Sequence, residues 1–302
     1  MPNPIWSPRF TLTPAISRSL TKIEMARVLV DTVILPLGGF EVLRGRARVR
    51  ASRSSTFIDG VRLTLEQAAA VIADETAEIA GLEKDVAEVR NYSKALQKAE
   101  EWAKMSLPLT ETLIGRFHRL AMTGKSSCPT HLRKKKSAVK NSVTGDVVYL
   151  PPRPEDLPEL IAALEIWTEE ARSSELAVPV IAGLVHYQLA ALRPFNDGNG
   201  KAARLCADFI LMRDGYSLSG LIMPEEQYAE DLDSYYQALN VHGELIDYYE
   251  GRAEADITPW LEYYLASMVQ SCEISLNEMA AYFASSSAKS RRKRKNSQGL
   301  KP

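Results

Sequence analysis

The segment at residues 192–204, with the sequence LRPFNDGNGKAAR, constrains the fold more than any other part of the chain. Before it, apolar residues between 180 and 192 recur at the spacing of one helical face. Pro194 predicts that this helix ends just before it. The glycines of GNG at 198–200 can adopt the positive φ angles of a tight turn, and a second apolar helix is expected from about 201 to 212. The sequence therefore predicts two helices joined by a glycine-rich turn.

A turn of this kind can bind an anion. The backbone N–H groups of residues 198–200 would converge on one point, and the positive N-terminus of the second helix would face the same point. Lys201 and Arg204 are three residues apart, so they share a helix face and could direct two cations there. Asp197 is the one carboxylate at the rim, and a hard oxygen ligand beside phosphates suits Mg²⁺. We interpret the segment as a phosphate-binding turn, although GNG also occurs in ordinary helix–turn–helix connections.

The complete segment is far more specific than its glycines alone. It resembles the signature of the Fic family, H-x-F-x-D/E-G-N-G-R/K-x-x-R. The matching residues are Phe195, Asp197, Gly198, Asn199, Gly200, Lys201 and Arg204. The preceding VHYQL at 185–189 is similar to the helix that leads into this signature in Fic proteins. The chain departs from the signature at its first position, where the family has His and this chain has Arg193.

The resemblance implies an all-α, mainly helical Fic fold with one short β-hairpin as a flap. It also implies a protein adenylyltransferase, which moves AMP from ATP to a Ser, Thr or Tyr hydroxyl of a protein target that the sequence does not identify. Asp197 would hold Mg²⁺ on the phosphates. The amides of 198–200 would cradle phosphate, with Asn199 helping to fix the anion hole, and Lys201 and Arg204 would neutralise its charge.

Arg193 stands where the catalytic His of the family takes the proton from the attacking hydroxyl. An imidazole can accept that proton, whereas a guanidinium stays protonated and offers no acceptor. Losing general-base help costs about 10²–10⁴ in rate. His186 lies seven residues earlier and accompanies the catalytic His in related sequences, so it is a poor substitute; His131, near the flap, is another candidate. Two alternatives stay open: a transferase that is weakened or inactive, or a nucleotide-binding regulatory pseudoenzyme.

A possible inhibitory motif precedes this region. Many Fic proteins carry an inhibitory helix with the pattern S/T-x-x-x-E-G/N, and Ser55 and Asp59-Gly60 match its spacing, with Asp in place of Glu. The carboxylate of Asp59 would pair with Arg204 and compete with a nucleotide γ-phosphate for the same guanidinium. Asp is one methylene shorter than Glu, so its reach is open. The alternative is a plain helix terminus capped by Gly60.

Two short β-prone stretches, at 138–139 and 147–150, flank the turn sequence TGD at 144–146. We expect them to form a β-hairpin, the only strand pair in the chain. The resemblance implies that this hairpin is the flap that holds a target peptide by strand addition, with Tyr149 and Leu150 at its end.

The remaining pattern is helical. Helices are expected at about 13–33, 40–52, from 64, 84–104, 109–122, 154–173, 228–239 and from 258 to 283. Thr64 and Gln67 have the spacing of a capping box. His118 is expected to be at most half-buried and to lack a partner.

The expected organisation has three parts. Residues 1–60 form an N-terminal helical region, 61–283 the Fic core, and 284–302 a disordered basic tail. The tail could touch nucleic acid, but we interpret its charges, like those at 133–136, as solvated.

The net charge of −1 argues against nucleic acid or an anionic membrane as a general partner. Three widely spaced cysteines (Cys128, Cys206 and Cys272) suggest no disulfide framework. No signal peptide or membrane-spanning run is expected, so we expect a cytoplasmic protein. Apolar helix faces could serve a homodimer, although core packing explains them equally.

Overall fold

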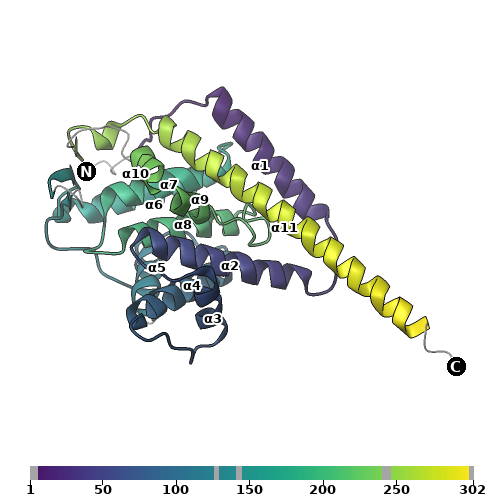
Figure 1. The fold of residues 1–302 in the computed structure, drawn as a ribbon. Helices are drawn as coiled ribbons and strands as arrows, with labels where there is room; N and C mark the ends of the chain where they lie inside the picture. Colours follow the sequence, from purple (N-terminus) through teal and green to yellow (C-terminus); the bar gives the residue numbers. More distant parts are fainter. Residues whose placement is uncertain (1–5, 126–128, 141–144, 240–245, 299–302) are drawn as a thin grey trace.

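The computed structural model describes residues 6–125, 129–140, 145–239 and 246–298, with side chains up to residue 286. The fold is mainly helical, as expected (Figure 1). The α-helices are α1 (Pro14–Thr32), α2 (Gly39–Ile58), α3 (Leu65–Ala73), α4 (Glu83–Lys104), α5 (Glu111–Thr123), α6 (Leu157–Arg172), α7 (Val178–Leu192), α8 (Asn199–Arg213), α9 (Glu225–Glu230), α10 (Leu232–Leu239) and α11 (Thr258–Gln298). Short 3₁₀ helices cover Pro154–Asp156 and Arg252–Glu254.

Helices α7 and α8 form the centre of the molecule. They pack against each other, α4 and α5 cover α8, and α6 and α11 cover α7. Nearly every residue of both helices is buried. The sequence of α7 is apolar on almost all sides, whereas α8 also buries polar and charged residues, among them Lys201 and Arg204. In Figure 1, α11 crosses the molecule with α1 beside it. The loop between α7 and α8 is therefore held by two helices that cannot move without disturbing the core.

The ends of several helices follow the sequence signals. Thr64 and Gln67 form the expected capping box at the start of α3. α7 ends at Arg193, whose φ of 45° is left-handed. The second helix, α2, continues to Ile58 rather than ending near residue 52, so Ser55 lies in its last turns and Asp59 is its C-cap. This extension places Ser55 and Asp59 next to α8, which α2 contacts.

The expected hairpin is present but belongs to a larger sheet. Strand β1 (Val139–Lys140) pairs antiparallel with β2 (Val147–Leu150), with Val139 opposite Tyr149. A third strand, β3 (Ile246–Asp247), pairs parallel with β2 and corrects the expectation of a single strand pair. A strand of two residues is too short to show an alternating pattern, so the sequence did not reveal it. Residue 144 of the expected turn lies outside the described residues.

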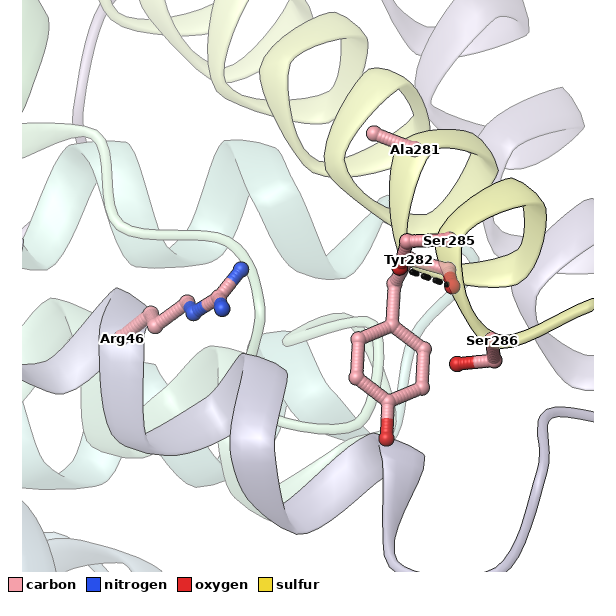
Figure 2. A pocket seen from close by; sticks show the side chains of 5 residues that line it. All are labelled: Arg46, Ala281, Tyr282, Ser285 and Ser286. Carbon is pink, nitrogen blue, oxygen red and sulfur yellow. Dashed lines mark hydrogen bonds between the residues drawn. The ribbon is translucent and has the colours of Figure 1, made fainter. Parts of the chain in front are cut away.

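The last helix extends further than expected. α11 continues to Gln298, into the segment from 284 that composition marked as disordered. No Gly or Pro interrupts residues 285–298, and lysine, arginine and alanine favour helices. Figure 2 shows a surface pocket of about 500 Å³ where α11 passes α2, lined by Arg46, Tyr282 and three small residues. A Cβ on Gly39 would lie 2.9 Å from the Tyr282 ring, so α2 needs its glycine there.

Within the described residues, none of the helices combines the length and apolar character needed to cross a bilayer. Cys206 and Cys272 are buried free thiols, and Cys128 lies outside the described residues.

Candidate functional site

One pocket of about 660 Å³ collects most of the site residues that the sequence suggested. This volume is typical of a small-molecule site. The pocket is lined by Asp59, Val139, Lys140, Val148, Tyr149, Ala190, Arg193, Asp197, Gly198, Asn199, Gly200, Arg204, Asp233, Tyr235, Tyr236, Leu239 and Arg252. Ser55 contacts Arg204 beside it, whereas Lys201 and Leu150 do not line it.

The glycine-rich turn is closed by Asn199. Its Oδ1 accepts a hydrogen bond from the Phe195 N–H, and its Nδ2 donates to the Phe195 carbonyl, both at 2.8 Å. Phe195 is buried and anchors the loop in the core. Gly198 has a φ of 68°, and a Cβ there would lie 2.5 Å from the sulfur of Met122. The turn therefore requires glycine at this position for its conformation and for space.

His118 of α5 contacts the glycine-rich turn, a role that the sequence analysis did not predict. The side chain is buried, not half-exposed, and it does have partners. Its Nε2 lies 2.7 Å from the Asp197 carbonyl, its Nδ1 lies 2.8 Å from Thr130 Oγ1, and its ring stacks on Phe195. The contact with Asp197 joins residues 79 apart in the sequence, so only the fold reveals it. Burial lowers the pKa of His118.

Arg204 is buried and forms contacts with Ser55 and Asp59. Its Nη2 lies 2.8 Å from Asp59 Oδ2 and donates to the Ser55 carbonyl at 3.0 Å, while its Nε donates to Ser55 Oγ at 2.7 Å. The shorter reach of Asp is sufficient here because α2 extends to Ile58 and brings Asp59 next to α8. Although burial opposes it, the charge of Asp59 keeps the pKa of Arg204 above its usual value.

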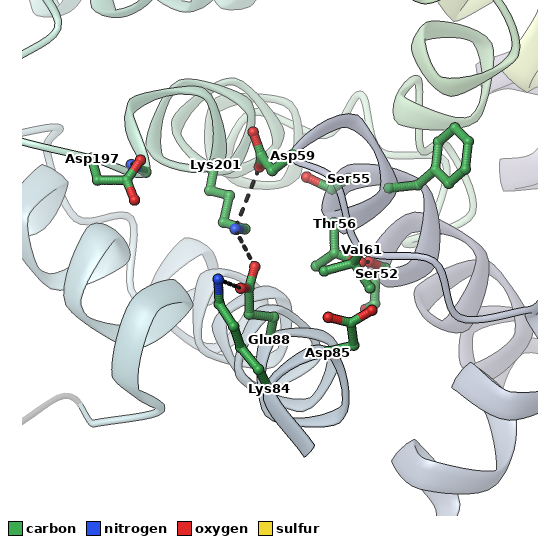
Figure 3. A network of polar contacts seen from close by, with 12 residues as sticks. Ser52, Ser55, Thr56, Asp59, Val61, Lys84, Asp85, Glu88, Asp197 and Lys201 are labelled. Atoms are coloured by element: carbon green, nitrogen blue, oxygen red, sulfur yellow. Dashed lines mark hydrogen bonds and ion pairs between the residues drawn. The ribbon is translucent and has the colours of Figure 1, made fainter. Parts of the chain in front are cut away.

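Lys201 is directed away from the pocket. Figure 3 shows its side chain between Asp59 and Glu88 of α4. The Nζ atom lies 2.8 Å from Glu88 and 3.5 Å from Asp59, and only 5% of the Lys201 side chain is exposed. Lys84 approaches the other oxygen of Glu88 at 3.7 Å. Lys201 and Arg204 are therefore held by the carboxylates of Glu88 in α4 and Asp59 after α2, and of the two cations only Arg204 lines the pocket.

Arg193 lines the pocket where the sequence placed it. Its carbonyl accepts a hydrogen bond from Arg133 Nε at 2.8 Å, and the N–H of Arg133 donates to the Pro194 carbonyl. Arg133 is buried, so it fixes the end of α7 and is not part of a solvated loop. Burial lowers the pKa of Arg193, against the charges of Tyr149 and Asp197. A guanidinium nevertheless remains protonated at neutral pH and cannot act as a base.

No histidine lines the pocket in the described part of the chain. His186 is buried with its Nε2 3.1 Å from the Tyr235 hydroxyl, and burial together with Arg204 holds its pKa well below the usual value. His131 is exposed and does not line the pocket. Tyr149 donates to the Ala191 carbonyl at 2.6 Å, and burial raises the pKa of its hydroxyl.

Asp197 is the residue that fits a metal ion. It is exposed at the rim, and its Oδ1 accepts from the Gly198 N–H at 2.7 Å. No group of three or more His, Cys, Asp or Glu in the described residues could hold a metal alone. Mg²⁺ commonly takes one or two protein carboxylates together with phosphate oxygens, so one carboxylate beside a phosphate site is compatible with it.

Comparison with known proteins agrees with this geometry. Residues 108–211 match the model of the Fic/DOC family, a range that includes α5, the flap strands and the glycine-rich turn. The protein adenylyltransferase Fic of Drosophila melanogaster is 38% identical over 115 residues, and that of Drosophila virilis is 34% identical over the same length. Each match covers 38% of this chain but only 20% of the relative, so the chain matches about a fifth of the length of these proteins.

Solved structures match over more of the chain. A Fic family protein from Desulfovibrio desulfuricans G20 superposes with a TM-score of 0.72 and 26% identity, over 90% of this chain and 77% of that one. A Fic domain containing signaling protein from Bacteroides thetaiotaomicron gives a TM-score of 0.70 at 22% identity, over 88% of this chain and 98% of that one. The chain therefore contains a Fic domain that includes residues 108–211, and its fold is that of solved Fic family proteins.

Proposed function

We propose that this Fic domain binds ATP with Mg²⁺ and transfers AMP to a protein target, and that Asp59 holds it in an autoinhibited state. The observation that carries the proposal is the 2.8 Å contact between Asp59 and Arg204 inside the pocket of the glycine-rich turn. The matched relatives are named protein adenylyltransferases, which supports ATP as the nucleotide.

The pocket offers suitable groups for each part of the nucleotide. The amides of Gly198–Gly200 and the N-terminus of α8 suit phosphate, and Arg204 supplies a cation. Asp197 would hold Mg²⁺, which would neutralise phosphate charge. Tyr235 and Tyr236 give the same pocket an aromatic surface for the base.

Autoinhibition follows from competition for one guanidinium. Arg204 already donates to Asp59 and Ser55, so a terminal phosphate must displace Asp59 before it can bind in the same way. Because the pair is largely buried, solvent screens it only weakly.

A second candidate is a nucleotide-binding regulatory pseudoenzyme. It is favoured by Arg193, which lines the pocket and cannot remove a proton from a hydroxyl acceptor. Both candidates bind Mg·ATP, and they differ in transfer. A hydroxyl acceptor without a base would react about 10²–10⁴ times more slowly.

Two measurements test these proposals. Calorimetry with Mg·ATP should give weak binding by the parent and tighter binding by Asp59→Gly, since the competing carboxylate is gone. Labelled ATP should then be offered to candidate targets by Asp59→Gly with and without Arg193→His. Labelling only with Arg193→His would favour the pseudoenzyme, and absence of binding by every variant would exclude nucleotide binding.

A further inference from the structure

The flap end of the pocket holds two arginines that form no ion pair with any of the described residues. Arg193, at the end of α7, and Arg252, in the 3₁₀ helix after β3, line this end together with Lys140 of β1. The Nε atom of each arginine is buried and has no hydrogen-bond partner. Within the described part of the chain, neither guanidinium forms an ion pair within 4.0 Å.

Arg252 is fixed in this position by aromatic rings. Its guanidinium lies 5.3 Å from the ring centre of Tyr149 and 4.5 Å from that of Tyr187, and the residue is only 6% exposed. Contacts with ring faces offset part of the cost of burying a cation. They supply no negative charge, however, so the site would gain from an anion.

The two ends of the pocket differ in this respect. At the other end Arg204 forms an ion pair with Asp59, which neutralises its positive charge. The charges of Asp197 and Asp59 both act on Arg193, yet in the described part of the chain neither carboxylate lies within ion-pair distance of it. An incoming anion would therefore meet unpaired positive charge at the flap end, beside the strand to which a target would bind.

We propose that Arg193, Arg252 and Lys140 form a second anion site, which binds an ionised oxygen group of the acceptor that receives AMP. The group would be a phosphate monoester or a carboxylate, because planar guanidinium forks match both. This inference rests on the proposed transfer of AMP from ATP in the same pocket.

An ionised acceptor removes the need for a general base. One oxygen of the acceptor anion attacks the α-phosphorus of ATP and forms a new P–O bond. The bond from that phosphorus to the oxygen bridging it to the β-phosphate breaks, and its electron pair leaves with pyrophosphate. No proton is transferred at any point, so Arg193 can orient the acceptor without accepting a proton. A phosphate monoester would give a pyrophosphate linkage to AMP, and a carboxylate would give an acyl adenylate.

The first experiment compares acceptors. The full chain with Asp59→Gly is incubated with Mg²⁺, α-labelled ATP and the N-acetyl amide of phosphoserine, glutamate or serine, with hydroxylamine added to trap any acyl adenylate. We expect labelled AMP attached to the phosphoserine compound, or the hydroxamate of the glutamate compound together with an equal amount of free labelled AMP, or both, which identifies the anion. We expect no label on the serine compound.

The second experiment measures binding of the phosphoserine compound by calorimetry, with and without a non-hydrolysable ATP analogue. Arg252→Gln should weaken this binding by about tenfold or more, since it removes charged hydrogen bonds. Arg252→Lys, which keeps the charge but loses the fork, should lie between the parent and Arg252→Gln. Arg18→Gln, an equal change of charge at an exposed position of α1, should have no effect. Circular dichroism and thermal unfolding confirm that each variant folds.

Several outcomes would overturn the proposal. The first is labelling of the serine compound at a rate equal to or above that of the other reactions. The second is neither a labelled compound nor a hydroxamate while the ATP analogue binds. The third is an affinity for the phosphoserine compound that neither change at Arg252 alters. Failure of Asp59→Gly to bind ATP would instead refute the proposed function. The anion site would still be decided by phosphoserine binding without nucleotide.

Discussion

Arg193 combines two unusual properties in one residue. It is left-handed, with a φ of 45°, although it is not glycine, and its guanidinium lines the pocket. His tolerates the left-handed region better than most side chains, so Arg193→His should keep the turn intact. Arg193→His can therefore test the role of the side chain in AMP transfer without disturbing the end of α7. Arg133 holds this end through a hydrogen bond to the backbone carbonyl of residue 193, which the substitution keeps.

Substitution of Gly198 tests whether the glycine-rich turn requires glycine at this position for its conformation and for space. Gly198→Ala should lower the free energy of unfolding by about 1–2 kcal/mol for the left-handed conformation alone. It should cost more because the new methyl group would meet Met122 and His118. Gly145→Ala is a matched control, since Gly145 has a φ of 78° with nothing within 4 Å of its Cβ position. Urea unfolding of both variants gives the difference, and equal losses would contradict the packing argument.

His118 makes stability depend on pH. Burial lowers its pKa in the folded protein, so the unfolded chain binds more protons once the pH falls below about 6.5. Stability should therefore be fully present above that pH and fall as the pH drops toward 5. In His118→Gln this loss should be smaller, although buried His186 still contributes. Urea unfolding at pH 7.5 and 5.5 measures it, and exposed His131→Gln should behave like the parent.

Among the secondary-structure elements, α2 and α4 together decide whether α8 presents its cations. Glu88 of α4 lies 2.8 Å from Lys201 (Figure 3). Asp59, which follows α2, lies at the same distance from Arg204. Glu88→Gln should therefore free Lys201 for phosphate and tighten Mg·ATP binding by several-fold to about tenfold. Glu101→Gln, on the exposed part of the same helix, should leave the affinity unchanged.

A double-mutant cycle separates the two carboxylates. Because Asp59 also lies 3.5 Å from Lys201, the effects of Asp59→Asn and Glu88→Gln on the free energy of binding should not simply add. Loss of the Glu88→Gln effect in a Lys201→Ala background would support the mechanism. An unchanged effect in that background would show that Glu88 acts elsewhere.

The same elements show what sequence reasoning could reach. Apolar periodicity predicted α7 and α8, and the position of Pro194 predicted the break between them. The resemblance suggested a pair between Asp59 and Arg204 but left the reach of Asp59 open, and the structure shows the two side chains in contact. Glu88, His118 and Arg133 were not foreseen, because each acts on the turn from a distant segment and has no local pattern. The direction of the Lys201 side chain likewise depends on its partner in α4.

At the scale of the whole molecule, α11 connects the N-terminal helix α1 with the central and C-terminal helices. It packs against α1, α7, α9 and α10, and buried Ser275 donates to the Leu221 carbonyl. Met279 is the last buried residue among its described side chains, and Tyr282 lies against Gly39 of α2. The stabilising part of the helix thus ends near residue 282.

Truncation tests where the folded unit ends. A chain that ends after Ser286 should change the free energy of unfolding by less than about 0.5 kcal/mol, as for exposed positions generally. A chain that ends after Gln270 also loses Cys272, Ser275 and Met279, and burial of a Met side chain alone contributes about 1.5–3 kcal/mol. Urea unfolding compares the two truncations with the full chain. A large decrease in the free energy of unfolding on removal of residues 287–302 would contradict this prediction and would mean that the basic segment packs against the domain. Nucleic-acid binding should in that case be measured only with the full chain.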